Sequence, residues 1–234
     1  MIKIENESLA NYLMFKLKKE DNKFTEEEIK TIDEIVLNPY DINNTYFEIN
    51  LDIIKAFLGL KKLTLKNLYI SQIDINNLSK LEYLENICFE KCEFENADFI
   101  SQLHLKELEL INCDINNYNF IYLMNSLVAL TVISGNISLE QLNILTEIRY
   151  LQISYSHINQ LQDINLPLLE ELHIDNSTIN DLSILKNLKK LKRLGISEEQ
   201  FLNNKELIKE MIENGVLVLN QNMVEFNEGG NLNE

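Results

Sequence analysis

Three residues able to bind a metal ion or transfer a proton, Glu171, His173 and Asp175, alternate along one short stretch of the chain. On a β-strand their side chains point to the same face, because successive side chains of a strand point to opposite faces. Residues two apart on a strand are nevertheless about 6.6 Å apart at Cα, which is far for ligands of one small ion. No second histidine occurs at the matching positions near Leu151 or Leu194. We therefore predict no metal site and no cofactor here.

Pairs of carboxylates, such as Glu107 and Glu109, are a second candidate for acid–base chemistry. An open sheet face, however, offers no pocket that would remove water from one carboxylate and raise its pKa. The sequence also has only six glycines, no phosphate-binding glycine loop and no Cys-x-x-Cys, since Cys88 and Cys92 are four apart. We predict no catalytic residues and a protein that is not an enzyme.

The chain around these residues repeats an apolar phrase, L-x-x-L-x-L-x-x-(N/C)-x-L, throughout residues 60–196. Its clearest copy consists of Leu105, Leu108, Leu110, Cys113 and Ile115. Copies are about 22 residues apart, which lies in the range of leucine-rich repeats. Each copy begins with the alternation of a short strand and continues with the three-residue apolar period of a tight helical return. The pattern predicts an α/β solenoid with parallel strands near residues 35–37, 63–65, 87–89, 108–110, 130–132, 151–153, 172–174 and 194–196.

Helices are predicted at both ends of this array, where a polar cap must cover the apolar layer that an open stack leaves exposed. In the N-terminal cap, residues 1–31, Ser8 precedes a four-residue apolar spacing, and Thr25 with Glu28 forms a capping box. The repeat array follows at residues 32–197. The extra length of its early units predicts a bulge or an added strand at Asn43–Leu51.

The C-terminal cap, residues 198–224, is predicted to contain one helix and a last strand. Ser197 and Gln200 form a capping box that opens the helix, which continues through Ile212 and stops at Gly215. The last strand is predicted at residues 216–219, and the polar residues 225–234 are predicted to be disordered. All of these segments are expected to form one continuous domain.

The repeat length and the L-x-x-L-x-x-L-x-x-L return resemble the internalin-type leucine-rich repeats of bacteria, over about residues 25–219. The resemblance implies a right-handed curved solenoid with helical caps that recognises proteins through its concave sheet. It implies no particular receptor. The chain departs from the family pattern because the loop asparagine is replaced, and hydrogen bonds to buried loop backbone must then come from Cys, Ser or water, or be missing. The replacing residues are Tyr40, Leu68, Cys92, Cys113, Gly135, Ser156 and Ser177.

The three cysteines, an odd number, do not form a disulfide framework. Cys92 and Cys113 occupy the same position of adjacent repeats, so they are predicted to stack about 5 Å apart at Cα, buried and unbonded. The first residues lack a basic region followed by an apolar stretch, and no apolar run is long enough for a spanning helix. We expect a cytoplasmic protein that spans no membrane. Export with the signal already removed stays open as an alternative.

The net charge of −16 argues against a nucleic-acid partner, because binding nucleic acid needs a basic surface that displaces counterions. From Glu93 to Leu185 the acidic residues are opposed by only two basic ones, Lys106 and Arg149. Such a negative middle would steer a basic partner toward it. The alternative is that surplus acid only keeps the chain soluble.

Strand alternation identifies the side chains on the concave face of the predicted sheet. Among them an aliphatic and aromatic centre is flanked by charged side chains, which is typical of protein-binding surfaces. The predicted protein-binding residues are Glu107, Glu109, Ile111, Thr131, Ile133, Tyr150, Gln152, Tyr155, Glu171, His173 and Asp175.

These observations favour a non-enzymatic, monomeric scaffold that binds a protein or peptide on the concave sheet. A first alternative is an acidic stoichiometric inhibitor, of the immunity-protein type, that neutralises a basic enzyme such as a nuclease or toxin. A second alternative is an exported, internalin-like adhesion module. The sequence does not identify the partner.

Overall fold

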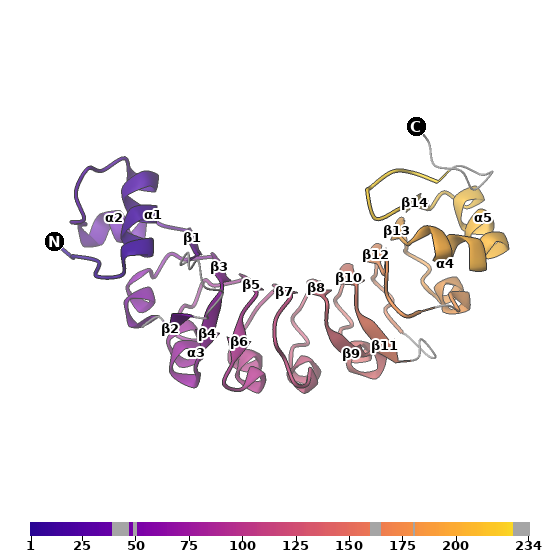
Figure 1. The fold of residues 1–234 in the computed structure, drawn as a ribbon, viewed down its shortest axis with the longest axis horizontal. Helices are drawn as coiled ribbons and strands as arrows, with labels where there is room; N and C mark the ends of the chain where they lie inside the picture. The colour runs from indigo at the N-terminus through magenta and orange to yellow at the C-terminus, as the bar shows by residue number, and fades with distance from the viewer. Residues whose placement is uncertain (39–46, 49–50, 160–164, 180, 227–234) are drawn as a thin grey trace. The chain divides into compact units, whose positions relative to one another are not determined.

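The computed structural model describes residues 1–38, 47–48, 51–159, 165–179 and 181–226 (Figure 1). The chain divides into two compact units, Met1–Asn116 and Asn117–Glu234. Each unit is a stack of short parallel strands, with helical return segments on one side of the strands. Within the described ranges, no helix is both long enough and apolar enough to cross a membrane.

The first unit begins with two helices and continues with a parallel sheet. The helices are α1 (Glu7–Leu17) and α2 (Glu26–Lys30). The sheet contains β1 (Glu34–Leu37), β3 (Lys62–Lys66), β5 (Asn86–Glu90) and β7 (Glu107–Ile111). A second small parallel sheet contains β2 (Phe47–Glu48), β4 (Leu68–Ile70) and β6 (Glu93–Phe94). The returns are η1 (Leu51–Ala56), α3 (Gln72–Leu78) and η2 (Ala97–Gln102).

The second unit has the same construction and ends in two helices and a strand. Its main sheet contains β8 (Ala129–Ile133), β10 (Tyr150–Ser154), β12 (Glu171–His173), β13 (Arg193–Gly195) and β14 (Leu217–Leu219). The small sheet pairs β9 (Asn136–Ser138) with β11 (His157–Asn159). The returns are η3 (Asn119–Leu123), η4 (Leu139–Ile144) and η5 (Ser183–Asn187). Helices α4 (Glu198–Asn203) and α5 (Lys205–Glu213) precede β14.

The strands predicted from the apolar phrase are confirmed to within one or two residues, and their pairing within each unit is parallel and in register. Leu63, for example, lies opposite Ile35 on one side and Ile87 on the other. The inward residues are fully buried: Leu110 is 1 % exposed and Ile153 is 0 % exposed. The repeat therefore supplies one aliphatic layer per unit to the core.

A left-handed residue follows each of six strands and turns the chain toward the loop. Its φ lies between 51° and 61° in every case. The six residues are Asn67, Lys91, Asn112, Ser134, Tyr155 and Asn176. Left-handed backbone is most easily adopted by Gly, Asn or Asp, so Tyr155 is an unusual occupant of this position.

Three side chains at the expected loop-asparagine position, Cys92, Cys113 and Ser156, donate hydrogen bonds to strand carbonyls and not to loop backbone. The Cys92 thiol donates to the Leu65 carbonyl at 3.3 Å, and the Cys113 thiol donates to the Phe89 carbonyl at 3.2 Å. In the second unit the Ser156 hydroxyl donates to the Ser154 carbonyl at 2.9 Å. These side chains therefore satisfy backbone carbonyls near the ends of the strands.

All three cysteines are free thiols, as predicted, but only one of the stacked pair is buried. Cys92 is 0 % exposed, whereas Cys113 is half-buried, so the prediction of two buried thiols is wrong for Cys113. The direct contact with the Cys113 thiol, together with burial, raises the pKa of Cys92. Cys92 is therefore a structural thiol and a poor nucleophile.

The N-terminal cap confirms one predicted helix start and corrects the other. Thr25 and Glu28 form the expected capping box at the start of α2. Helix α1 is capped by Asn6, not by Ser8: the Asn6 side chain accepts a hydrogen bond from the Leu9 amide at 2.8 Å. Because Asn is as good a cap as Ser, propensity alone did not separate the two positions.

The C-terminal cap contains two helices where one was predicted. The Ser197–Gln200 capping box is present, and Gly215 follows α5 with a φ of 86°. At Asn204 the helix breaks, because the Asn204 side chain bonds backbone groups: it donates to the Gln200 carbonyl at 3.0 Å and accepts from the Leu182 amide at 3.2 Å. A side chain that competes for backbone partners in this way interrupts a helix.

Two further expectations about irregular segments fall partly on described residues. The added strand expected within Asn43–Leu51 is present as β2, which pairs with β4, while residues 43–46 and 49–50 lie outside the described part. Disorder was expected from residue 225 onward, but Glu225 bridges to Leu219 and Phe226 is 2 % exposed. Phe226 stacks on Phe201 with ring centroids 4.5 Å apart, so an apolar contact holds this segment. Residues 227–234 lie outside the described part.

Candidate protein-binding surface

The outward side chains of each main sheet, those pointing away from the core, form what we name the open face of that unit. The predicted binding residues lie on or next to the strands of both open faces. Glu107, Glu109 and Ile111 lie on β7 of the first unit. The remaining eight lie in the second unit, on or directly after β8, β10 and β12.

The open face of the second unit contains a directional chain of hydrogen bonds. The Tyr150 hydroxyl donates to Gln152 Oε1 at 2.9 Å, and Gln152 Nε2 donates to the Ser154 hydroxyl at 3.2 Å. The Ser154 hydroxyl donates in turn to Asp175 Oδ1 at 2.8 Å. Polar networks with satisfied members fix the rotamers of their side chains. The surface along β10 is therefore pre-organised.

Asp175 is not the exposed rim charge that was predicted. Asp175 is only 6 % exposed, and its neighbour Ser154 is 1 % exposed. The carboxylate belongs to the buried end of the hydrogen-bond chain, where it orients Ser154. Thr131, at 8 % exposure, is likewise covered. Alternation places such residues on the right face, but burial on that face depends on the lengths of the neighbouring side chains.

The His173 ring fills the space that a side chain at Gly195 would otherwise occupy. Its Nε2 is 2.8 Å from Glu171 Oε1, and its ring centroid is 5.7 Å from that of Tyr150. On the neighbouring strand Gly195 is opposite His173, and a Cβ added at Gly195 would be 2.1 Å from His173 Nδ1. Glu171 is also 3.5 Å from Arg193. Contacts with neighbouring side chains therefore hold Glu171 and His173 in place on the open face.

Ile133 and the tyrosines are spread along the strand direction. Ile133 lies opposite Ser154, whereas Tyr150 lies opposite Ala129, so these two predicted binding residues lie near opposite ends of their strands. Tyr150 is partly exposed, and Tyr155 is 59 % exposed. Tyr155 combines large exposed area with a left-handed backbone, at a φ of 52°. A bulky residue in this conformation is strained by roughly 1 kcal/mol or more.

We expect Tyr155→Asn to raise the free energy of unfolding by about 1 kcal/mol, because Asn adopts left-handed backbone more easily than Tyr. The reciprocal change, Asn176→Tyr at the equivalent position of the next repeat, should lower it by a similar amount. Urea unfolding followed by circular dichroism measures both. Equal stability of the parent and Tyr155→Asn would show that no strain is stored at this turn.

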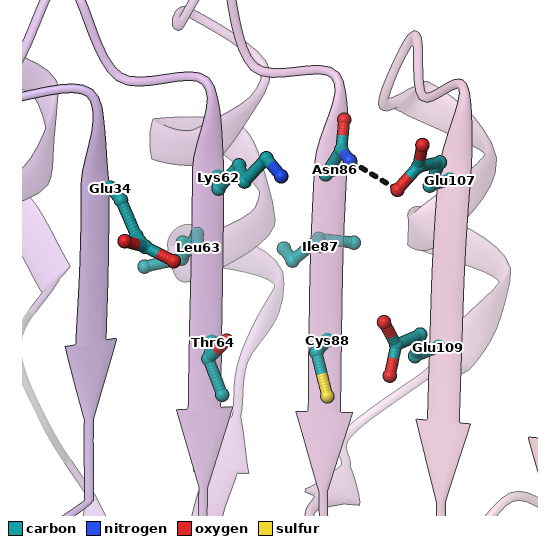
Figure 2. A pocket seen from close by; sticks show the side chains of 9 residues that line it. All are labelled: Glu34, Lys62, Leu63, Thr64, Asn86, Ile87, Cys88, Glu107 and Glu109. Atoms are coloured by element: carbon teal, nitrogen blue, oxygen red, sulfur yellow. Dashed lines mark hydrogen bonds between the residues drawn. The ribbon is translucent and has the colours of Figure 1, made fainter.

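The open face of the first unit has a shallow depression of ≈ 200 Å³ (Figure 2). Its lining comes from four neighbouring strands, β1, β3, β5 and β7. The lining residues are Glu34, Lys62, Leu63, Thr64, Asn86, Ile87, Cys88, Glu107 and Glu109. Glu107 and Glu109 stay exposed beside this depression, so it does not remove water from either carboxylate. The hollow arises because the short side chains of Thr64 and Cys88 lie between longer ones.

Neutral side chains of β5 lie beside the two carboxylates of β7. The Asn86 side-chain amide donates to Glu107, and Figure 2 shows the two side chains pointing toward each other. Glu109 lies opposite Cys88 on the neighbouring strand. Burial, followed by the charge of Glu109, raises the pKa of Cys88 to about 12. Neither Glu107 nor Glu109 is neutralised by these contacts, because amides and thiols carry no charge.

Cys88 is expected to react slowly with iodoacetamide at neutral pH, because the thiolate is the nucleophile and its pKa is raised to about 12. The alkylation rate should keep rising with pH up to that value. Glu109→Gln removes a charge that raises the pKa, so it should speed alkylation at a given pH. Peptide mass spectrometry after timed quenching measures the rate. A plateau near the pH of an ordinary thiol would contradict the stated environment.

Several side chains that shape the two faces were not among the predicted site residues. Ser154, Arg193, Gly195 and Asn86 act through partners on the next strand, about 21 residues away in the sequence. Aligning the strands of neighbouring repeats in register would have shown which side chains lie opposite the predicted site residues. Among the described residues no group of three or more potential metal ligands occurs.

Comparisons with known proteins identify the fold through solved structures. No family model matches the chain, and no curated protein matches it. Internalin InlF of Listeria monocytogenes is similar at 24% identity and a TM-score of 0.64, over 82% of this chain and 56% of that one. Internalin C2 of the same species is similar at 24% identity and a TM-score of 0.62, over 84% and 92% of the two chains. TLR13, in its complex with ssRNA13, is similar at 16% identity and a TM-score of 0.58, over 78% and 29%.

These likenesses define the class: the chain has the leucine-rich-repeat fold of an α/β solenoid. The particular resemblance is to the internalins, as the repeat length and the helical cap indicated. The chain spans little more than half the length of InlF. At these identities the likeness concerns the fold.

Proposed function

We propose that this protein is a non-enzymatic scaffold that binds a protein or peptide on the open face of its sheet. The observation that carries the proposal is Tyr155, a tyrosine 59 % exposed and held in left-handed backbone directly after the ordered strand β10. Its side chain contributes little to the core, and its backbone is strained. The same turn follows five other strands, but Tyr155 is its one aromatic occupant among these six, and strain held at an exposed bulky residue favours a functional role.

The neighbourhood of Tyr155 supports binding to a protein surface. Tyrosine supplies a large contact area with few rotatable bonds, and tyrosines are enriched among residues that dominate binding energy. The chain from Tyr150 through Gln152 to Ser154 fixes the adjacent side chains before a partner arrives. Pre-organisation lowers the entropy cost of association.

An inhibitor of a basic enzyme is a second candidate, and the depression on the first unit favours it. Three of its lining residues, Glu34, Glu107 and Glu109, are acidic, against one lysine, Lys62. The net charge of −16 would speed encounter with a basic protein and oppose binding of nucleic acid. The RNA bound in the TLR13 complex is a ligand of TLR13, and the likeness to this chain concerns the fold.

A peptide-display selection tests the proposal. Random peptides displayed on phage are selected on the immobilised chain, and enriched clones are assayed against the parent, Tyr155→Asn and Tyr122→Ala. Tyr122 is a matched control because it is a 43 % exposed tyrosine on the return η3. We expect clones that bind the parent and Tyr122→Ala equally well but do not bind Tyr155→Asn. Enrichment of no clones, or equal binding to all three proteins, would contradict the proposal.

A further inference from the structure

The depression on the first unit holds negative charge that the protein does not neutralise. Glu107 and Glu109 are exposed neighbours on one face of β7, where the neutral Asn86 side chain donates a hydrogen bond to Glu107 and the neutral Cys88 lies opposite Glu109. In the described part of the chain neither carboxylate forms an ion pair with Lys or Arg. Two neighbouring carboxylates without a direct ion pair complement a cation.

Some other carboxylates of the same unit are paired, in contrast to Glu107 and Glu109. Glu90, the next outward residue after Cys88 on β5, has its Oε2 2.5 Å from Lys66 Nζ. Glu85 Oε1 is 2.5 Å from Lys106 Nζ. Lys62 borders the depression, but it makes no ion pair among the described residues, although Glu34 lies opposite it on β1. Glu34, a third lining carboxylate, is 3.7 Å from Lys16, so Glu107 and Glu109 are the lining acids that form no ion pair within the described ranges.

We infer that the open face of the first unit docks an extended basic segment of a partner protein, with an arginine or lysine side chain in the depression. This inference rests on the proposed scaffold function and specifies the chemistry of its partner. The floor is made by the short polar side chains of Thr64 and Cys88, and Figure 2 shows Glu109 beside Cys88 and Glu107 beside Asn86. A volume of ≈ 200 Å³ accommodates one long side chain.

The geometry of the sheet explains why the segment is extended. Outward positions recur two residues apart along each strand and one strand apart across the sheet, so Asn86 and Cys88 form rows with Glu107 and Glu109. A single exposed ion pair contributes little, typically below about 1 kcal/mol. A segment that places several cations along these rows adds such terms and gains a faster, salt-dependent association.

The charge of Glu109 also acts on the thiol beside it. Burial is the largest cause that raises the pKa of Cys88; the charge of Glu109 comes next and Glu90 adds to it, while the charge of Lys66 opposes them. A thiol at the floor of the depression thus already resists becoming an anion. The same field favours an ammonium or guanidinium group at this place.

The test uses the full chain and a synthetic peptide of alternating glycine and arginine, with citrulline in place of arginine as the neutral counterpart. Affinity is measured by fluorescence anisotropy at low and moderate salt. The variant Glu107→Gln with Glu109→Gln is compared with Glu20→Gln with Asp21→Asn, which removes the same charge from an exposed loop of the same unit. We expect the first variant to lose about tenfold in affinity for the arginine peptide. The control should stay within about twofold of the parent.

Amide chemical shifts locate the peptide. The arginine peptide, and not the citrulline peptide, should shift residues 62–66, 86–90 and 107–109. Equal losses in the two double variants, or shifts elsewhere only, would overturn the docking site. If clones from the display selection still bind while the arginine peptide does not, the scaffold function stands and this inference falls. If neither binds, both are wrong.

Discussion

Replacing Leu110 or Ile153 by Ala is expected to lower the free energy of unfolding by roughly 2–5 kcal/mol. Both side chains point into the aliphatic core of their unit, where they are 1 % and 0 % exposed. Truncation removes buried methyl groups and leaves a cavity that a stack of short, paired strands cannot close. Because each repeat contacts only its neighbours, the lost layer weakens the stack on both sides.

Denaturant unfolding measures this loss, with Glu109→Ala as the control for Leu110→Ala. Glu109 is the exposed neighbour of Leu110 on β7, so its truncation makes no cavity and should change the stability by less than about 0.5 kcal/mol. A loss below about 1 kcal/mol for Leu110→Ala or Ile153→Ala would mean that these residues do not face the core.

Gly195→Ala is expected to destabilise the second unit by about 1–3 kcal/mol. The added Cβ would be 2.1 Å from His173 Nδ1, closer than any contact that two unbonded atoms tolerate. The ring of His173 would have to move, and its contacts with Glu171 and Tyr150 would change with it. The cost is one of overpacking, since the conformation of Gly195 does not require glycine.

A double-mutant cycle distinguishes this mechanism from a general intolerance of β13. His173→Ala removes the obstructing ring, so Gly195→Ala should cost much less in that background than in the parent. The coupling energy between the two sites should reach about 1 kcal/mol or more. Additive effects of the two substitutions in thermal and urea unfolding would show that the His173 ring does not fill the space above Gly195.

The main strands could be predicted because one signal, the apolar phrase, fixes inward residues such as Leu63, Leu110 and Ile153 in every repeat. Burial of these residues and the 3.3 Å strand rise leave little freedom for the strand's position. The capping boxes at Thr25 and Ser197 were predictable for a similar reason, since both partners lie within one turn. The strands and the capped helix starts are therefore predictable from local sequence signals and from the repeat period.

The open faces were harder to predict because their details depend on pairs from different repeats. The burial of Asp175 follows from its bond to Ser154, and the place of His173 follows from Gly195. The depression depends on the relative lengths of side chains on four strands, which alternation along one strand does not describe. The break at Asn204 likewise needs the Leu182 amide, a distant partner.

The measurement that tests the account most directly is the affinity of a selected peptide for Tyr150→Ala. Tyr150 is partly exposed and begins the hydrogen-bond chain on β10, so its truncation should weaken binding by about 2 kcal/mol or more. Tyr150→Phe keeps the ring and should retain most of the affinity, and Tyr122→Ala should retain all of it. Thermal unfolding confirms that each variant is folded. Unchanged affinity of Tyr150→Ala, in a folded protein, would contradict binding on this face.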